Sequence, residues 1–507
     1  MGLLKVDVLA LGMLTAIRKA LADIGRRRGY VFQWQDIPAD CTDTYDMICK
    51  ADTVGVFQIE SRAQMAMLPI LKPRSYYDLV VEVALVRPGP IEGGTAKKYI
   101  DARNGNVPVH YPSPEIELAL GRTYGVPIFQ EQCMQLSILC AGFSAGEADR
   151  LRRGMAAWRR TGSLDQFEPR IINGMLERGY TEQFARSIFE QMKGFSSYGF
   201  PESHAASFAL IVWASCWIKR HYPAEFVCAL LNSQPMGFYS PSQLVQDARR
   251  HQVEIRPIDV LHSSWDCTLE NIDHQPAVRL GMRLIDGFKK ASAERIVEAR
   301  TPGLFINAEE LAQRAELEHL DMRQLASADA LASLSGHRRN QVWDAAALRR
   351  PPELLKQAPI DEIEIDLPEA AEEEAVLWDF RATGLTLRSH PLALKRHRLR
   401  QFATAAKLAR VPDGVQIRYC GQVTLRQSPP TAKGVMFISL EDETGAVQVI
   451  VWPNLRDDYR DVIRAAKCLG VKGRWQRRGD SCNLIAEELV DMSHVLGGVP
   501  TRSRNYR

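Results

Sequence analysis

The period of the hydrophobic pattern changes along this 507-residue chain, and the change restricts the folds open to it. From about residue 45 to 235, apolar residues recur at helical spacing between short Pro/Gly breaks. From about 411 to 496, apolar and polar residues alternate in short runs, a pattern typical of about five strands. A chain this long exceeds one hydrophobic core, so we expect roughly three or four domains. The pattern therefore predicts a multi-domain, mainly α-helical protein with a C-terminal OB-type β-barrel.

A glycine turn between two apolar stretches lies ahead of the barrel region. The spacing predicts a helix over Val278–Ile285, a turn at Gly287 and a second helix over Lys290–Ile296. A weaker echo of this pattern follows at Leu331–Trp343. The unit fits a generic helical hairpin with a glycine at the end of its first helix, or a DNA-binding hairpin.

Two charged stretches separate this hairpin from the barrel. Residues 361–374 carry many carboxylates and no Lys or Arg, which predicts a solvated linker. The basic run Lys395–Arg400 fits either contact with a nucleic-acid backbone or a solvated helix face. The aromatic residues Phe437 and Trp452 fall in expected strands. They fit either stacking on the bases of a single-stranded template or filling the core, and we expect the core.

Composition limits the ligands and the cellular compartment that can be expected for this protein. A net charge of +3 is small for this length, so any nucleic-acid surface must arise from local clusters of cations. The ten cysteines include no C-x-x-C pair, which favours free thiols in a reducing cytoplasm over zinc sites or disulfides. The longest apolar run, Ala205–Ile218, falls short of the ~20 residues that cross a bilayer. We therefore expect a soluble, cytoplasmic protein with no membrane segment.

The run Tyr198-Gly-Phe-Pro-Glu-Ser-His204 places a serine and a histidine where an apolar helix begins. Unpaired backbone N–H groups and the helix dipole make such a start suitable for phosphate. Upstream, Arg152 and Arg153 lie close to Asp149, and Lys5 lies two residues before Asp7. Together these groups suggest polyphosphate chemistry. Taken singly, the arginines fit a solvated helix face and the histidine fits a simple cap.

Several short motifs follow one another along the chain: Leu4-Lys-Val-Asp7, Gly55-Val-Phe-Gln58-Ile-Glu60-Ser61, Arg87-Pro-Gly-Pro90, Tyr124-Gly-Val-Pro-Ile-Phe-Gln130-Glu-Gln132, Ala148-Asp-Arg-Leu-Arg152-Arg153 and Tyr198–His204. In this order they resemble the motifs of the bacterial C-family replicative polymerases, the DNA polymerase III alpha subunit group, over nearly the whole chain. Gly-Phe-Pro-Glu-Ser-His stands where the replicative subunits have Gly-Phe-Asn-Lys-Ser-His, and with residues 237–251 it looks like the error-prone branch, also called ImuC.

The resemblance implies nucleotidyl transfer from a deoxynucleoside triphosphate to a DNA primer, assisted by two Mg²⁺ ions. Asp7 aligns with the last of three palm aspartates, so it is the expected catalytic and metal-binding residue. The first two aspartates are expected upstream of Met1, and one carboxylate makes a poor magnesium site. We therefore expect the chain to be inactive alone.

Other residues receive roles from the same resemblance. Lys5, Arg152, Arg153 and His204 match positions that contact the triphosphate, where cations offset charge on the leaving pyrophosphate. His204 is also a candidate proton donor to that pyrophosphate. The unit around Gly287 resembles a helix-hairpin-helix, in which hairpin amides with Lys289 and Lys290 hold DNA phosphates.

The resemblance also implies partners: primer-template DNA, deoxynucleoside triphosphates and the accessory proteins ImuB and ImuA. A clamp-binding Gln-x-x-Leu-Phe peptide is missing, since only Leu377-Trp-Asp-Phe380 stands in that region, so clamp access is expected to be indirect. Two alternatives remain: a fragment of the replicative subunit, and a non-catalytic DNA-binding scaffold. The expected domains are the end of the palm at 1–20, as an α+β remnant, helical fingers at 21–265, a helix-hairpin-helix region at 266–360, an acidic linker and basic run at 361–410, and the barrel at 411–500.

Overall fold

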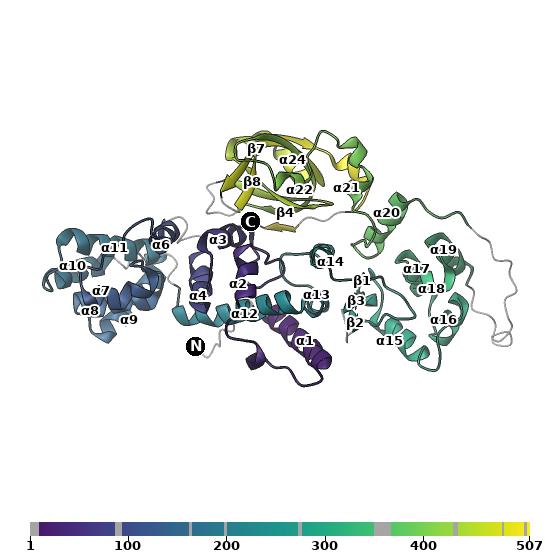
Figure 1. The fold of residues 1–507 in the computed structure, drawn as a ribbon, viewed down its shortest axis with the longest axis horizontal. Helices are drawn as coiled ribbons and strands as arrows, with labels where there is room; N and C mark the ends of the chain where they lie inside the picture. The colour runs from purple at the N-terminus through teal and green to yellow at the C-terminus, as the bar shows by residue number, and fades with distance from the viewer. Residues whose placement is uncertain are drawn as a thin grey trace. The chain divides into compact units, whose positions relative to one another are not determined.

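The chain forms two compact units in the computed structural model: one over residues 34–220 and one that joins residues 1–33 to residues 221–507 (Figure 1). Positions 1–9 are outside the described residues, and Lys5, Asp7 and the first part of the expected end of the palm (1–20) lie there. The structure describes residues 10–86, 94–161, 165–196, 200–271, 276–348, 367–428, 434–478, 481–500 and 504–506.

The unit over residues 34–220 is built of helices, as the apolar spacing predicts. Ser61 and Ser75 each start a helix through a capping box, in which the serine hydroxyl and the side chain three residues later exchange bonds with the backbone. The helices are α2 (Thr42–Cys49), α3 (Arg62–Leu71), α4 (Tyr76–Leu85), α6 (Thr95–Arg103), α7 (Pro114–Leu120), α8 (Gln130–Ala141), α9 (Ala145–Thr161), α10 (Glu168–Leu176), α11 (Glu182–Ser196) and α12 (Glu202–His221).

Helices α7 to α11 gather around one core (Figure 1). Its members are apolar side chains that recur along one face of each helix, among them Leu136, Leu151, Ile171 and Phe189. The approach of α10 to the end of α8 is close at Gly174, where a Cβ atom would lie 2.1 Å from the carbonyl oxygen of Ala141. Glycine is therefore required at this crossing by lack of space.

The second unit begins with α1 (Leu11–Arg28), which packs on α13 (Pro223–Leu231). A small sheet follows α14 (Pro241–Arg250), with strand order β1-β3-β2; β1 and β3 are parallel, and β2 and β3 are antiparallel. Its strands are β1 (Ile255–Arg256), β2 (Thr268–Glu270) and β3 (Ala277–Arg279). The helices that come next are α15 (Lys290–Ala299), α16 (Ala308–Arg314), α17 (His319–Ser327), α18 (Ala332–Ser335), α19 (Arg338–Ala347), α20 (Glu372–Ala382), α21 (Pro391–Leu394) and α22 (Ala405–Leu408).

Two local predictions in this unit are wrong. The helix expected over Val278–Ile285 is instead strand β3 followed by a single 3-10 turn, Met282–Leu284. Val278 pairs with both neighbouring strands, and a short apolar run cannot be assigned to strand or helix by periodicity alone. The solvated linker expected over residues 361–374 is wrong for its last residues. Glu372–Glu374 form the first turn of α20, where carboxylates complement the helix dipole.

The predicted OB-type barrel is confirmed. Strands β4 (Gln416–Gln427), β5 (Met436–Asp442), β6 (Gly445–Val451), β7 (Cys468–Arg478) and β8 (Ser481–Asp491) pair in the order β5-β6-β8-β7-β4, and β4 pairs with β5 to close the barrel. Helices α23 (Pro453–Asp458) and α24 (Arg460–Ala465) connect β6 to β7, and β9 (Arg504–Tyr506) adds a parallel edge beside β4.

The core position expected for Trp452 is wrong, because 53% of this residue is exposed. Val447, Val449 and Val451 of β6 point into the barrel, so the next residue in a period of two points outward. Phe437, which precedes the core residue Ile438 on β5, is only partly buried for the same reason. Among the described helices, none is both long and apolar enough to cross a membrane.

Candidate nucleotide and DNA sites

The start of α12 is held by the start of α8. Phe200 forms a parallel bridge with Phe129, and its carbonyl oxygen accepts the N–H of Gln130 at 3.2 Å. The Oε2 atom of Glu131 accepts the backbone N–H of Glu202 at 2.9 Å. These contacts satisfy one of the unpaired amides at the start of α12 and define where the helix begins.

His204 lies in the first turn of α12 and is half-buried between two phenylalanine rings. Its imidazole centroid is 5.0 Å from that of Phe200 and 4.2 Å from that of Phe208. Phe208 packs edge-on against Phe57, which anchors α12 to the loop before α3. The imidazole is therefore confined by aromatic packing.

Glu202 joins a second cluster beside the same helix start. Its Oε1 atom lies 3.3 Å from the Nη1 atom of Arg122, and the guanidinium of Arg122 lies 3.8 Å from the centroid of the Tyr77 ring. Burial raises the pKa of Tyr77, and the Glu202 carboxylate raises it further. In the sequence, Pro201 and Glu202 only distinguish two branches of a family, whereas in the structure Glu202 forms an ion pair with Arg122.

Arg152 and Arg153 share one carboxylate. The Nε and Nη2 atoms of Arg152 lie 3.0 and 2.8 Å from Oδ1 of Asp149, and Nε of Arg153 lies 2.8 Å from Oδ2. Hydrogen bonds from the two arginines hold the pKa of Asp149 below its usual range. Asp149 cancels one of the two charges, so the trio keeps a net charge of +1, and the Arg153 side chain remains 72% exposed.

The described contacts put the predicted nucleotide residues in two separate clusters of the helical unit. His204 contacts the aromatic side chains around α12, while Arg152 and Arg153 contact Asp149 on α9. The other two predicted residues, Lys5 and Asp7, lie outside the described residues.

Gly287 forms the turn ahead of α15, with φ of +72°. Other residues rarely adopt this conformation, and a Cβ atom here would also meet the Nε2 atom of Gln324 at 3.0 Å. The backbone N–H of Asp286 donates to Ala382 at 2.8 Å, and Gln324 donates to the carbonyl of Asp286 at 3.2 Å. The hairpin is thus tied to α20 and α17.

The two hairpin lysines differ in their surroundings. Lys289 is the residue before α15; it is exposed and has no hydrogen-bond or ion-pair partner in the described parts of the chain. Lys290 is also exposed, but its Nζ atom lies 3.3 Å from Oε1 of Glu294, one turn along α15. Of the two, Lys289 is the more available for an anionic ligand.

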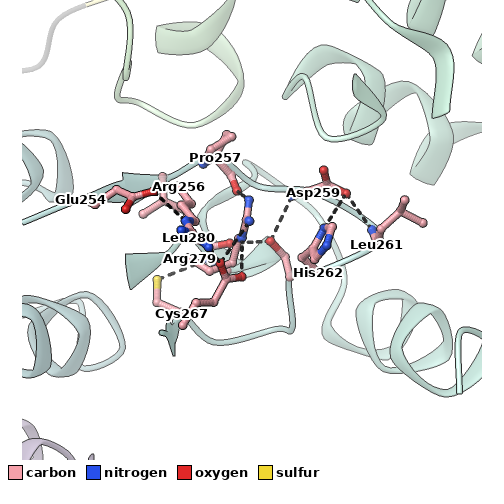
Figure 2. Close-up of polar contacts among 12 residues, drawn as sticks. Glu254, Arg256, Pro257, Asp259, Leu261, His262, Cys267, Arg279 and Leu280 are labelled. Carbon is pink, nitrogen blue, oxygen red and sulfur yellow. Dashed lines mark hydrogen bonds and ion pairs between the residues drawn. The ribbon is translucent and has the colours of Figure 1, made fainter. Parts of the chain in front are cut away.

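The small sheet that leads into this hairpin is cross-linked by a carboxylate. Nε of Arg279 on β3 lies 2.8 Å from Oε1 of Glu270 on β2, and Arg256 on β1 contacts the other oxygen of Glu270. Figure 2 shows the Arg256 and Arg279 side chains among the polar contacts of this region. Arg279 also donates to the carbonyl of Pro257 at 2.9 Å. Burial alone would raise the pKa of Glu270, but the two arginines outweigh it and lower that pKa. The ion pairs join all three strands.

Sequence reasoning missed the supports of the α12 start, namely Glu131 and Gln132. Gln132 is buried; its Oε1 atom accepts the N–H groups of Ile128 and Phe129 at 2.8 and 3.1 Å, and its Nε2 atom donates to Thr123 at 2.7 Å. In the sequence, Phe129-Gln-Glu-Gln132 belongs to a motif of the resemblance and has no role of its own. The available signal is the run of three polar residues, Gln130 to Gln132, directly after the apolar Ile128 and Phe129.

Three domain families match successive parts of the chain. Residues 13–179 match the bacterial DNA polymerase III alpha subunit finger domain, residues 252–341 match a helix-hairpin-helix motif, and residues 417–492 match an OB-fold nucleic-acid-binding domain. The first match places this part of the fold in the class of bacterial DNA polymerase III alpha domains, in agreement with the family resemblance.

Similarity to individual proteins extends over the whole chain. The chain is 50% identical over 528 aligned residues to the error-prone DNA polymerase of Methylococcus capsulatus, an alignment that covers 100% of this chain and 50% of the relative. It is 52% identical to the proteins of the same name from Bordetella parapertussis (99% of this chain, 49% of the relative) and Dechloromonas aromatica (100% and 49%). The chain thus spans about half the length of the curated relatives it matches.

Proposed function

We propose that this chain is part of an error-prone DNA polymerase of the C family, in the ImuC branch, which extends primers across damaged DNA. The observation that carries the proposal is about 50% identity over the whole chain to proteins named error-prone DNA polymerase. The order of the finger, helix-hairpin-helix and OB-fold matches supports it.

In this proposal the nucleotide triphosphate binds Lys5, Arg152, Arg153 and His204. The net positive charge that Arg152 and Arg153 retain beside Asp149 suits a polyphosphate, and it would offset negative charge on the leaving pyrophosphate. The confinement of His204 between Phe200 and Phe208 suits a residue that must present one nitrogen in a constant direction.

Asp7 is the proposed catalytic carboxylate and Mg²⁺ ligand of this chain. Mg²⁺ prefers carboxylate and phosphate oxygens in octahedral arrangement, so one aspartate needs further carboxylates beside it. We place the other two palm aspartates in the part of the polymerase that this chain does not match. When bound, the metal ions would stabilise charge on the attacking and leaving oxygens.

The hairpin is the proposed contact to duplex DNA. The turn at Gly287, with Lys289 and Lys290 beside it, presents backbone amides and cations to phosphates without reading base sequence. We retain the expected division into the end of the palm (1–20), fingers (21–265), helix-hairpin-helix region (266–360), linker (361–410) and barrel (411–500) as part of this proposal. ImuB and ImuA are the proposed protein partners, with indirect access to the sliding clamp.

Primer extension tests the proposal. The chain would be incubated with primer-template DNA, Mg²⁺ and four deoxynucleotides, alone and together with the N-terminal half of the polymerase. Extension only in the combined sample, abolished by Asp7→Ala, is the expected result. Extension by the chain alone would refute the proposed need for further aspartates. DNA binding without extension in either sample would instead favour the non-catalytic DNA-binding scaffold.

A further inference from the structure

The unit that contains the hairpin and the barrel has a pocket of about 610 Å³. The first turn of α14, the hairpin over residues 283–288, the end of α20 and strand β4 contribute to its lining. This volume lies within the ~300–1,000 Å³ usual for pockets that bind small organic groups, and it is too small for a DNA duplex.

The pocket is lined by uncharged groups that can form hydrogen bonds. Ser242 and Gln246 come from α14, and Gln422 comes from β4. None of these three side chains has a hydrogen-bond partner within the described ranges, although all are partly buried. Two amides and one hydroxyl therefore remain available to a ligand, and a partly buried polar group gains more from a partner than an exposed one does.

His390 adds a fourth uncharged group to the lining. Its Nδ1 atom accepts the backbone N–H of Leu392 at 3.2 Å, so the ring proton belongs on Nε2. Burial lowers the pKa of His390 to about 4, while Glu443 opposes that effect and Arg250 and Arg396 reinforce it. At neutral pH the imidazole is uncharged and Nε2 is a hydrogen-bond donor.

The charged residues of the lining differ in how fully they are paired. Arg283 lies 2.7 Å from Asp266, and Glu441 lies 2.7 Å from Arg250. Arg381, at the end of α20, is exposed and has no ion-pair partner among the residues that the structure describes. An anionic group in the pocket would therefore meet Arg381, with the exposed Asp286 as the opposing charge.

We propose that this pocket holds one unpaired nucleotide of a DNA single strand, with its base against Gln246, Gln422 and His390 and its phosphate at Arg381. The edges of a nucleobase present neutral donors and acceptors, which amide and imidazole groups match, and these edges are accessible only when the base is unstacked. The pocket lies between the hairpin, a proposed duplex contact, and strand β4 of a barrel type that binds single strands. This inference rests on the proposed function.

Fluorescence anisotropy with two DNA probes tests the inference. One probe is a blunt duplex, and the other is the same duplex with a single-stranded template extension. The whole 507-residue chain is expected to prefer the extended probe. Gln246→Leu and Gln422→Leu keep side-chain volume but remove hydrogen bonds, and each is expected to weaken binding of the extended probe about fivefold. Binding of the blunt probe should not change.

Gln416→Leu is the matched control, since Gln416 is also on β4 but its amide donates to Glu487 outside the pocket. A 2-aminopurine base moved along the extension should report one position whose fluorescence changes in the wild type and not in Gln422→Leu. If both probes bind and the two pocket variants leave the preference intact, the pocket inference is wrong while the proposed function stands. If the wild type binds neither probe, the proposed function fails and the inference fails with it.

Discussion

Glu82 is fully buried on α4, and neither of its carboxylate oxygens has a hydrogen-bond partner among the described residues. Burial raises its pKa to about 8. Because the pKa is higher in the folded state than in the unfolded state, the stability linked to this group is present below pH 4.5 and is lost as pH rises toward 8. At neutral pH the folded protein therefore holds Glu82 protonated.

We predict that Glu82→Gln makes the free energy of unfolding less dependent on pH between 4.5 and 8. The lost stability in the wild type should be on the order of 4 kcal/mol over this range, since one pKa unit corresponds to about 1.4 kcal/mol. Urea unfolding of both proteins at several pH values measures it. Glu117→Gln, at an exposed site on α7, should leave the wild-type profile unchanged. If the free energy of unfolding of the wild type depends on pH as little as that of Glu82→Gln, the prediction is wrong.

Glu131 has a positional role at the start of α12. Glu131→Ala removes the acceptor for the N–H of Glu202 and should cost about 1 kcal/mol in the free energy of unfolding. Glu131→Gln keeps an oxygen in the same place and should restore most of that loss. Amide hydrogen exchange at Glu202 is the local measurement. Gln135→Ala, at an exposed position of the same helix, is the control; equal effects of the alanine and glutamine variants would argue against this role.

At the scale of elements, the crossing of α10 over the end of α8 depends on a missing side chain. Gly174→Ala would place a Cβ atom 2.1 Å from the Ala141 carbonyl oxygen, so the helices must separate, at a cost of about 1–3 kcal/mol. Gly146→Ala on α9 meets no atom within 4 Å and should be neutral or slightly stabilising. Thermal unfolding of both variants checks the prediction, which fails if the two alanines behave alike.

The hairpin and the barrel show when hydrogen bonding between strands, and not the local hydrophobic pattern, decides the secondary structure. Short apolar runs such as 278–285 satisfy a helical or a strand pattern, and the hydrogen bonds of β3 with β1 and β2 select the strand. The barrel strands β4 and β6 are longer, with 12 and 7 residues, and burial alternates along β6, so the assignment of β6 needed no knowledge of its partners.

At the scale of the whole molecule, a net charge of +3 leaves DNA affinity to a few local cations. We predict that Lys289→Ala weakens duplex binding and reduces the slope of log K against log salt by about 0.9, the contribution of one phosphate contact. Lys472→Ala should have a smaller effect, because Lys472 already pairs with Glu488 at 2.6 Å on the barrel. Titrations at several salt concentrations give both slopes, and equal slopes for Lys289→Ala and the wild type would contradict the contact.

The order of the helical, hairpin and barrel regions follows from the amino-acid sequence alone. The hydrophobic repeat of a helix, about 3.6 residues, and that of a strand, 2 residues, are local properties of the chain. The sequence also selected Arg152, Arg153 and His204 through their motifs, and their role in binding nucleotide stays a prediction. Only the tertiary structure decided that Asp149 cancels part of the arginine charge, that Glu131 holds the start of α12 and that Trp452 faces outward. These contacts depend on side-chain geometry, and the contact between Glu131 and Glu202 joins residues far apart in the chain. A pattern along the sequence encodes neither.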